Sequence, residues 1–200
     1  MWVDVQPRLE LLTFNNDGSG DLYVNDQYGD LYRFNPSTPD SVAQIADFSE
    51  LVNRFQSGGQ QGLRSFAFHP GYQDPASAGY LKLYTAHSET NNRGPNHDSV
   101  VAEWTLNADG IVDSSIASRE ILRFEQPRGD HNIGRIGFDP NQSPGDADWG
   151  NLYIALGDGG NFSNRDGMLN PNGQDTKLHL GSILRIDPAN PDASAATPYS

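Results

Sequence analysis

The chain has 200 residues, no cysteine, and 26 acidic against 13 basic side chains, which gives a formal net charge of −13. The lack of cysteine excludes disulfides and thiolate metal sites, and the negative charge argues against nucleic-acid binding, because phosphates would be repelled. No stretch approaches the ~20 apolar residues that cross a bilayer, so we expect no membrane span. Frequent glycine (21) and proline (13), with 10% aromatic residues, favour a folded, turn-rich, all-β chain.

The first predicted strands flank a polar turn in residues 14–26, FNNDGSGDLYVND. Glycine and asparagine supply the positive φ that tight turns need, so the segment is typical of a hairpin connection. A further strand is expected at 29–35, GDLYRFN. Residues 40–55 then carry apolar side chains at helix-compatible spacing, and we expect a strand followed by a short helix there.

The same plan recurs twice along the chain. Residues 66–89 and 136–160 each combine an apolar strand, a polar turn and a second strand with a Leu-Tyr pair, as residues 14–26 do. Another strand follows each of these later units, at 99–107 and at 181–188. Antiparallel units with a period of ~40–70 residues are typical of β-propeller blades. We therefore expect an all-β fold with about three blades of an incomplete propeller.

Three blades do not close a ring, because propellers typically have about 4–8 of them. We expect the open ends to expose strand edges and apolar faces, and residues 1–200 to be part of a longer chain or of an assembly. The connection between the second and third strands of a unit is longest at 158–180. Long loops rich in glycine and asparagine commonly carry the function of such a scaffold.

The sharpest candidate for chemistry is His131, in the segment RGDHNIGRIGFDP at 128–140. Histidine changes its charge near neutral pH and can remove a proton from a substrate hydroxyl. Asp130, directly before it, could orient the imidazole and favour its charged form. The alternative is a structural histidine that bonds to the backbone where a strand begins. Spacing alone leaves both interpretations open.

Two other segments carry weaker signals. In residues 56–70, QSGGQQGLRSFAFHP, glutamine amides among glycines could bond a carbohydrate or a cofactor carbonyl, although a solvated turn is the simpler interpretation. In residues 155–167, ALGDGGNFSNRDG, Asp158 could coordinate a cation or orient a base. The EF-hand, P-loop and dinucleotide-binding patterns are absent, so this segment is a turn by default.

Four motifs together carry a family resemblance. GQQGLRSFAFHPGY, DHNIGRIGFDP, LYIALGDGG and LHLGSILRID, in this order and at these separations, resemble the soluble glucose/sorbosone dehydrogenase family. The resemblance runs from about residue 10 to the C-terminus and covers the N-terminal half of the family's domain. It implies a quinoprotein on a six-bladed β-propeller that uses pyrroloquinoline quinone and calcium.

The resemblance also implies roles for four residues. His131 matches the catalytic base, which takes the proton from the anomeric hydroxyl of an aldose as hydride passes to the quinone. Asp130 would orient that imidazole and contact the sugar, Gln60 would line the cofactor and sugar pocket, and Asp158 would support the base. The calcium ligands and most cofactor-anchoring cations would lie beyond residue 200, so we expect the chain alone to bind the quinone weakly and to be inactive.

The activity implied is that of a periplasmic or secreted sugar dehydrogenase that passes electrons to an external acceptor. Residues 1–12 themselves carry no export signal. Two other functions stay open. One is a non-catalytic propeller module that binds carbohydrate or protein. The other is a calcium-dependent lactonase-type propeller that uses the Asp-His pair on water.

Overall fold

The computed structural model describes residues 8–14, 19–92, 97–160 and 172–189. In this part of the chain there are eleven strands, one short α-helix and one turn of 3-10 helix. Their bounds are β1 (Leu9–Phe14), β2 (Leu22–Asp26), β3 (Asp30–Phe34), β4 (Val42–Asp47), α1 (Phe48–Leu51), β5 (Leu63–Phe68), β6 (Lys82–Thr90), β7 (His97–Thr105), β8 (Arg119–Glu125), β9 (Ile133–Phe138), β10 (Leu152–Leu156), the 3-10 turn (Asn172–Gln174) and β11 (Ile183–Ile186). Among these residues, no helix is long and apolar enough to cross a membrane.

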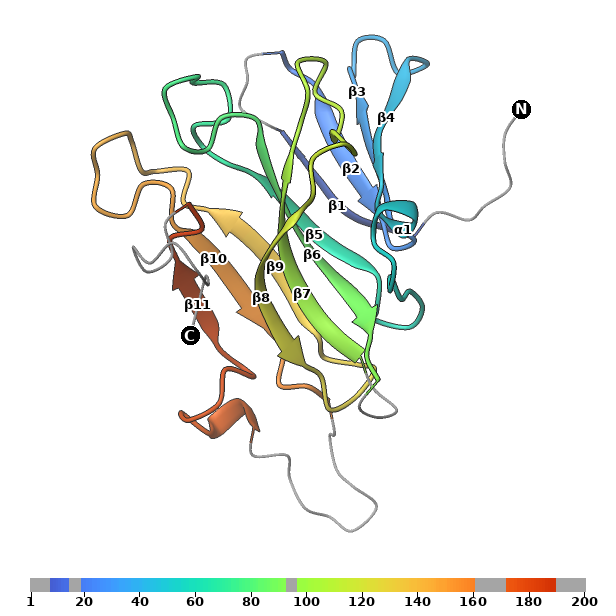
Figure 1. Cartoon of the computed structure of the whole chain (residues 1–200), viewed down its shortest axis with the longest axis vertical. Coiled ribbons are helices and arrows are strands. Elements are labelled where there is room, and N and C mark those ends of the chain that lie inside the picture. Colours follow the sequence, from blue (N-terminus) through green and yellow to red (C-terminus); the bar gives the residue numbers. More distant parts are fainter. Residues whose placement is uncertain (1–7, 15–18, 93–96, 161–171, 190–200) are drawn as a thin grey trace.

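The strands form three sheets that follow one another along the chain (Figure 1). The first sheet has the order β1-β2-β3-β4, the second β5-β6-β7-β8, and the third β9-β10-β11. Every neighbouring pair is antiparallel. The prediction of an all-β fold built from three antiparallel units is therefore confirmed, and the arrangement is compatible with a partial propeller. The six-bladed type stays a prediction.

Most expected elements coincide with observed ones. The segment 40–55 forms β4 and then α1, whose N-terminus is capped by Asp47: its carboxylate accepts a hydrogen bond from the Ser49 N–H at 2.9 Å. The sequence pattern does not predict β8, because four of its seven residues are charged. The buried Ile121 and Phe124 show why it is a strand nonetheless, since both pack into the core.

Two apolar clusters hold the sheets together. The first lies between the first and second sheets, where Leu31 and Phe48 meet Phe66, Leu83 and Trp104. The second lies between the second and third sheets. It combines these side chains: Tyr84, Ala86, Val101, Ile121 and Phe124 with Ile133, Ile136, Leu152, Ile154 and Leu156. Because neighbouring residues of a strand face opposite sides, β6 and β7 feed both clusters and are buried along nearly their whole length.

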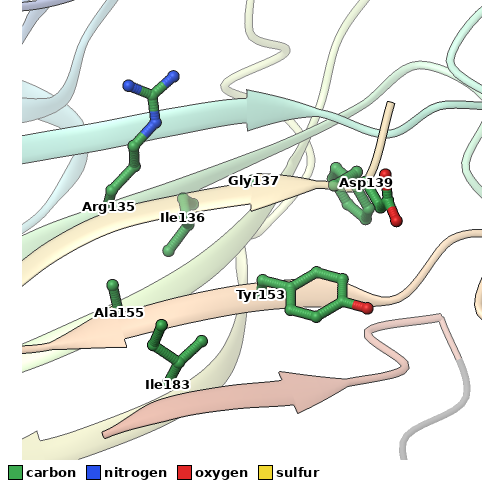
Figure 2. Close-up of a pocket in the computed structure, with 8 residues that line it drawn as sticks. Arg135, Ile136, Gly137, Asp139, Tyr153, Ala155 and Ile183 are labelled. Atoms are coloured by element: carbon green, nitrogen blue, oxygen red, sulfur yellow. The ribbon is translucent and has the colours of Figure 1, made fainter. Parts of the chain in front are cut away.

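The third sheet leaves one face open. A pocket of about 480 Å³ lies on this face across β9, β10 and β11. Figure 2 shows Ala155 and Ile183 on neighbouring strands there, and Ile183 is 73% exposed. On the first sheet, three apolar side chains of β1 are exposed as well: Leu9, Leu12 and Phe14. The expectation that the open ends present apolar faces is confirmed.

A charged cluster crosses the second sheet at the end of β6. The Glu89 carboxylate accepts hydrogen bonds from Arg54 (3.1 Å) and Arg123 (3.0 Å), and lies 3.3 Å from Nε2 of His87. Its side chain is only 11% exposed. The hydrogen bond from His87, followed by that from Arg123, outweighs burial and lowers the pKa of Glu89 to about 2.

Glu89→Gln is expected to lower the free energy of unfolding by about 3 kcal/mol at pH 7, because the lowered pKa of Glu89 is a stability contribution. For a carboxylate whose folded pKa lies below its usual value of 4.5, this contribution is complete above that value and is lost as the pH falls toward about 2. Urea unfolding at pH 7, 4.5 and 3 measures it. The gap between wild type and variant should narrow as the pH falls.

The matched control is Glu125→Gln, at the exposed end of the same sheet. This variant should unfold like the wild type at each pH. A gap for Glu89→Gln that stays constant from pH 7 to pH 3 would contradict the assignment.

Candidate functional site

Three connections meet where β5 and β9 begin and where β10 ends. β9 and β10 are antiparallel, with Ile133 opposite Leu156, so the turn before β9 and the turn after β10 lie at the same edge. β5 runs beside β9, because the Ile136 N–H donates to Oγ of Ser65 at 3.2 Å. The turns thus bring side chains together that lie 71 and 27 residues apart in the chain.

An imidazole and a carboxylate form the centre of this edge. Nδ1 of His131 lies 2.8 Å from Oδ1 of Asp158, which also accepts a hydrogen bond from the Gly160 N–H at 3.1 Å. Both side chains are partly exposed, at 26% and 37%. In the neutral ring this bond places the proton on Nδ1, so Nε2 is the basic nitrogen. A ring in this tautomer can accept a proton only at Nε2.

The Asp130 carboxylate is not the one bonded to Nδ1 of His131, although the two residues are adjacent in the sequence. Its carboxylate lies against Gly160, where an added Cβ would meet Oδ1 at 2.1 Å. The carboxylate bonded to Nδ1 of His131 is that of Asp158. The orienting role expected of Asp130 therefore stays a prediction. Adjacent residues point in different directions, so sequence adjacency is a poor guide to which acid meets a ring.

The backbone of His131 is strained. Its φ is 53°, in the left-handed region that residues with side chains rarely adopt. Its N–H donates to Oε1 of Gln60 at 2.7 Å, and its carbonyl accepts from the Gly159 N–H at 3.0 Å. At Gly157 an added Cβ would lie 2.1 Å from the His131 carbonyl oxygen, so only glycine fits there. Both neighbouring turns thus hold His131 in one conformation.

Gln60 joins the first turn to this arrangement. Its side chain is exposed, and its Oε1 serves the His131 backbone rather than a ligand. The NH₂ group of the same amide is a hydrogen-bond donor, and it can bind a hydroxyl or carbonyl oxygen of a ligand. The pocket-lining role expected of Gln60 stays a prediction, whereas its position beside His131 is observed.

Asn132 belongs to the site, although the sequence pattern does not single it out. Its Nδ2 donates to the carbonyls of Gln60 (3.1 Å) and Gly129 (3.2 Å). Its own carbonyl accepts from the Gly157 N–H at 2.9 Å. Asn132 is 6% exposed and links all three turns. Its place directly after a candidate base is the only signal in the sequence that could have indicated it.

The site contains few groups that would hold a cation or an anion. Within the described ranges, no group of three or more histidine, aspartate or glutamate side chains could bind a metal ion. Among the described residues, the hydrogen bonds around His131 join it to the amide of Gln60 and the carboxylate of Asp158. This donor set fits proton transfer and orientation of a hydroxyl. The sequence predicts a functional loop after Asp158, and residues 161–171 of this loop lie outside the described residues.

Comparison with known proteins places these features in a family. The chain is 25% identical over 170 residues to quinoprotein glucose dehydrogenase B of Acinetobacter calcoaceticus, which covers 80% of this chain and 33% of that protein. It is 29% identical over 180 residues to the Hedgehog-interacting proteins of Mus musculus and Homo sapiens, covering 86% of this chain and 23% of theirs. The chain thus spans a third or less of these relatives. The family model for glucose/sorbosone dehydrogenase matches residues 10–199, and the chain therefore belongs to the glucose/sorbosone dehydrogenase family.

Proposed function

We propose that this chain supplies the proton-accepting part of a sugar dehydrogenase, in which His131 is the general base for the anomeric hydroxyl of an aldose. The observation that carries the proposal is the bond between His131 and Asp158, held on a strained backbone. Strain of this kind is concentrated at functional sites. Membership of the family and the similarity to a quinoprotein glucose dehydrogenase favour sugar oxidation over other uses of a base.

Each residue has a distinct task in this proposal. Nε2 of His131 accepts the hydroxyl proton, and Asp158 keeps the ring in the required tautomer and stabilises the imidazolium that forms. Gln60 fixes the His131 backbone, and its NH₂ group binds an oxygen of the sugar or of the cofactor. Gly157 allows the turns to approach closely enough for these contacts.

Pyrroloquinoline quinone and calcium are part of the proposal through the family. When bound, the quinone supplies the acceptor for the hydride. Gln60 and His131 would face it, and cationic side chains would anchor its acidic groups. An external electron acceptor and a periplasmic or secreted location come with the same assignment.

The direct test is dye reduction by aldoses, with added quinone and calcium, by the natural gene product that contains this chain. His131→Gln should lower kcat about 10²–10⁴-fold, because the general base is lost. The matched control is His179→Gln, an exposed histidine outside the hydrogen-bonded set, and it should retain its turnover. Unchanged turnover in His131→Gln would remove His131 from the mechanism.

Asp158→Asn tests whether the carboxylate acts through the ring. The amide keeps the size of the side chain but offers Nδ1 a weaker, uncharged partner, so kcat should fall by roughly 10²-fold. KM should change little, because in this proposal Asp158 acts through its bond to the imidazole and not by binding the sugar. Steady-state kinetics over a series of aldose concentrations measures kcat and KM separately. A rise in KM with unchanged kcat would instead make Asp158 a substrate-binding residue.

A second candidate is a binding module for a protein partner. It is favoured by the 29% identity to the Hedgehog-interacting proteins over 86% of this chain, because these relatives are named for an interaction. Two measurements on the same protein distinguish the sugar dehydrogenase from the binding module. One is dye reduction by aldoses, and the other is binding of a Hedgehog protein, followed by surface plasmon resonance. Saturable binding that His131→Gln leaves intact, without aldose oxidation by the wild type, would favour the module.

A further inference from the structure

The buried polar atoms without a protein partner are concentrated in one place. In the described part of the chain, such atoms occur on these side chains: Asn25 (Oδ1), Ser88 (Oγ), His97 (Nε2), Gln126 (Oε1) and Asn132 (Oδ1). All but Asn25 belong to the region where the second sheet meets the third, behind the turn that carries His131. Each of these four residues is at most 6% exposed.

The strand register places these four residues around Ser99. In the pairing of β6 with β7, Ser88 lies opposite Ser99, and His97 is two residues before Ser99 on the same face. Oγ of Ser99 accepts from Nε2 of Gln126 at 2.9 Å and lies 3.5 Å from the Ile133 nitrogen. Asn132 directly precedes Ile133. The four residues therefore lie around Ser99, on β6, on β7, directly after β8 and directly before β9.

Existing hydrogen bonds decide which of these atoms donate. Nδ1 of His97 lies 3.1 Å from Nε2 of Gln61, whose Oε1 accepts from Gln56, so Nδ1 is the acceptor and Nε2 carries the proton. Burial lowers the pKa of His97, which keeps the ring neutral. Both hydrogen bonds of the Asn132 NH₂ go to carbonyls, which leaves Oδ1 as an acceptor.

The four atoms form a balanced set. Nε2 of His97 and the Ser88 hydroxyl can donate, whereas the amide oxygens of Gln126 and Asn132 can only accept. Buried polar groups without any partner are strongly destabilising. A water molecule can both donate and accept hydrogen bonds, so internal water can complete the bonding of donors and acceptors alike.

We propose that Ser88, His97, Gln126 and Asn132 form a buried hydration site behind the His131 turn, and that internal water in this site completes their hydrogen bonds. The site lies between the second and third sheets, beside the contact between Oγ of Ser99 and the Ile133 nitrogen. Through Asn132, which bonds the Gln60 and Gly129 carbonyls, it braces the His131 turn internally and against the turn that carries Gln60. Asn132 is a positioning residue in this arrangement. The hydration site stands whether or not His131 is a catalytic base.

Nuclear Overhauser measurements on the full chain test the proposal at the His97 ring. The Nε2 proton should show a cross-peak at the water frequency, with the sign of a water that stays bound longer than the protein takes to tumble. The variant Ser88→Ala excludes one trivial source of this signal, exchange at the Ser88 hydroxyl. It breaks no hydrogen bond between protein groups, since Ser88 Oγ has no protein partner. The cross-peak should persist in Ser88→Ala.

The melting temperature of the same variant gives an independent readout. If water occupies the site, Ser88→Ala removes one of its partners, and the melting temperature should fall by a few degrees. If the site is dry, the variant removes an unsatisfied hydroxyl, and the melting temperature should rise. The control Ser65→Ala loses the bonds between Ser65 Oγ and Ile136 but should keep the His97 cross-peak. A missing cross-peak in the wild type, its loss in Ser88→Ala, or a higher melting temperature would each overturn the proposal.

Discussion

The hydrogen bond between Nδ1 of His131 and Oδ1 of Asp158 is the interaction on which the candidate site depends. It joins the turn before β9 to the turn after β10 at 2.8 Å, and it decides which ring nitrogen is basic. The bond requires His131 to keep a left-handed backbone and Gly157 to lack a side chain. A conformation of this cost persists only where its surroundings impose it. Here Gln60, Gly159 and Asn132 impose it from three turns.

The sheets make this geometry possible because the second sheet is apolar on both faces. One face packs on the first sheet through residues such as Leu83 and Trp104, and the other packs on the third sheet through Tyr84 and Val101. This double burial fixes β5 beside β9, so the edge with Gln60 meets the edge with His131. At the same edge the apolar core gives way to polar side chains, among them Ser99 and His97. The site therefore lies over a polar layer rather than over a purely apolar one.

Much of the fold could be predicted from the sequence, because local patterns carry it. Strand alternation, polar turns and the recurring Leu-Tyr pairs indicate three antiparallel units, and the apolar spacing in residues 40–55 indicates α1. The sequence pattern does not predict β8, because most of its residues are charged. Its burial depends on Ile121 and Phe124, which pack against another sheet. Within the site, the motifs of a family select Gln60, His131 and Asp158, and the structure places these three residues together.

By itself, the sequence determined the class of fold, the order of its units and the residues with the chemistry for a site. These depend on side-chain type and on spacing along the chain, which are local properties. Only the tertiary structure decided that Asp158 rather than Asp130 meets Nδ1 of His131, and that Asn132 ties the turns together. The physical reason is that these contacts join segments 27 and 72 residues apart. Their geometry follows from how the sheets pack, and nothing in the neighbouring sequence encodes it.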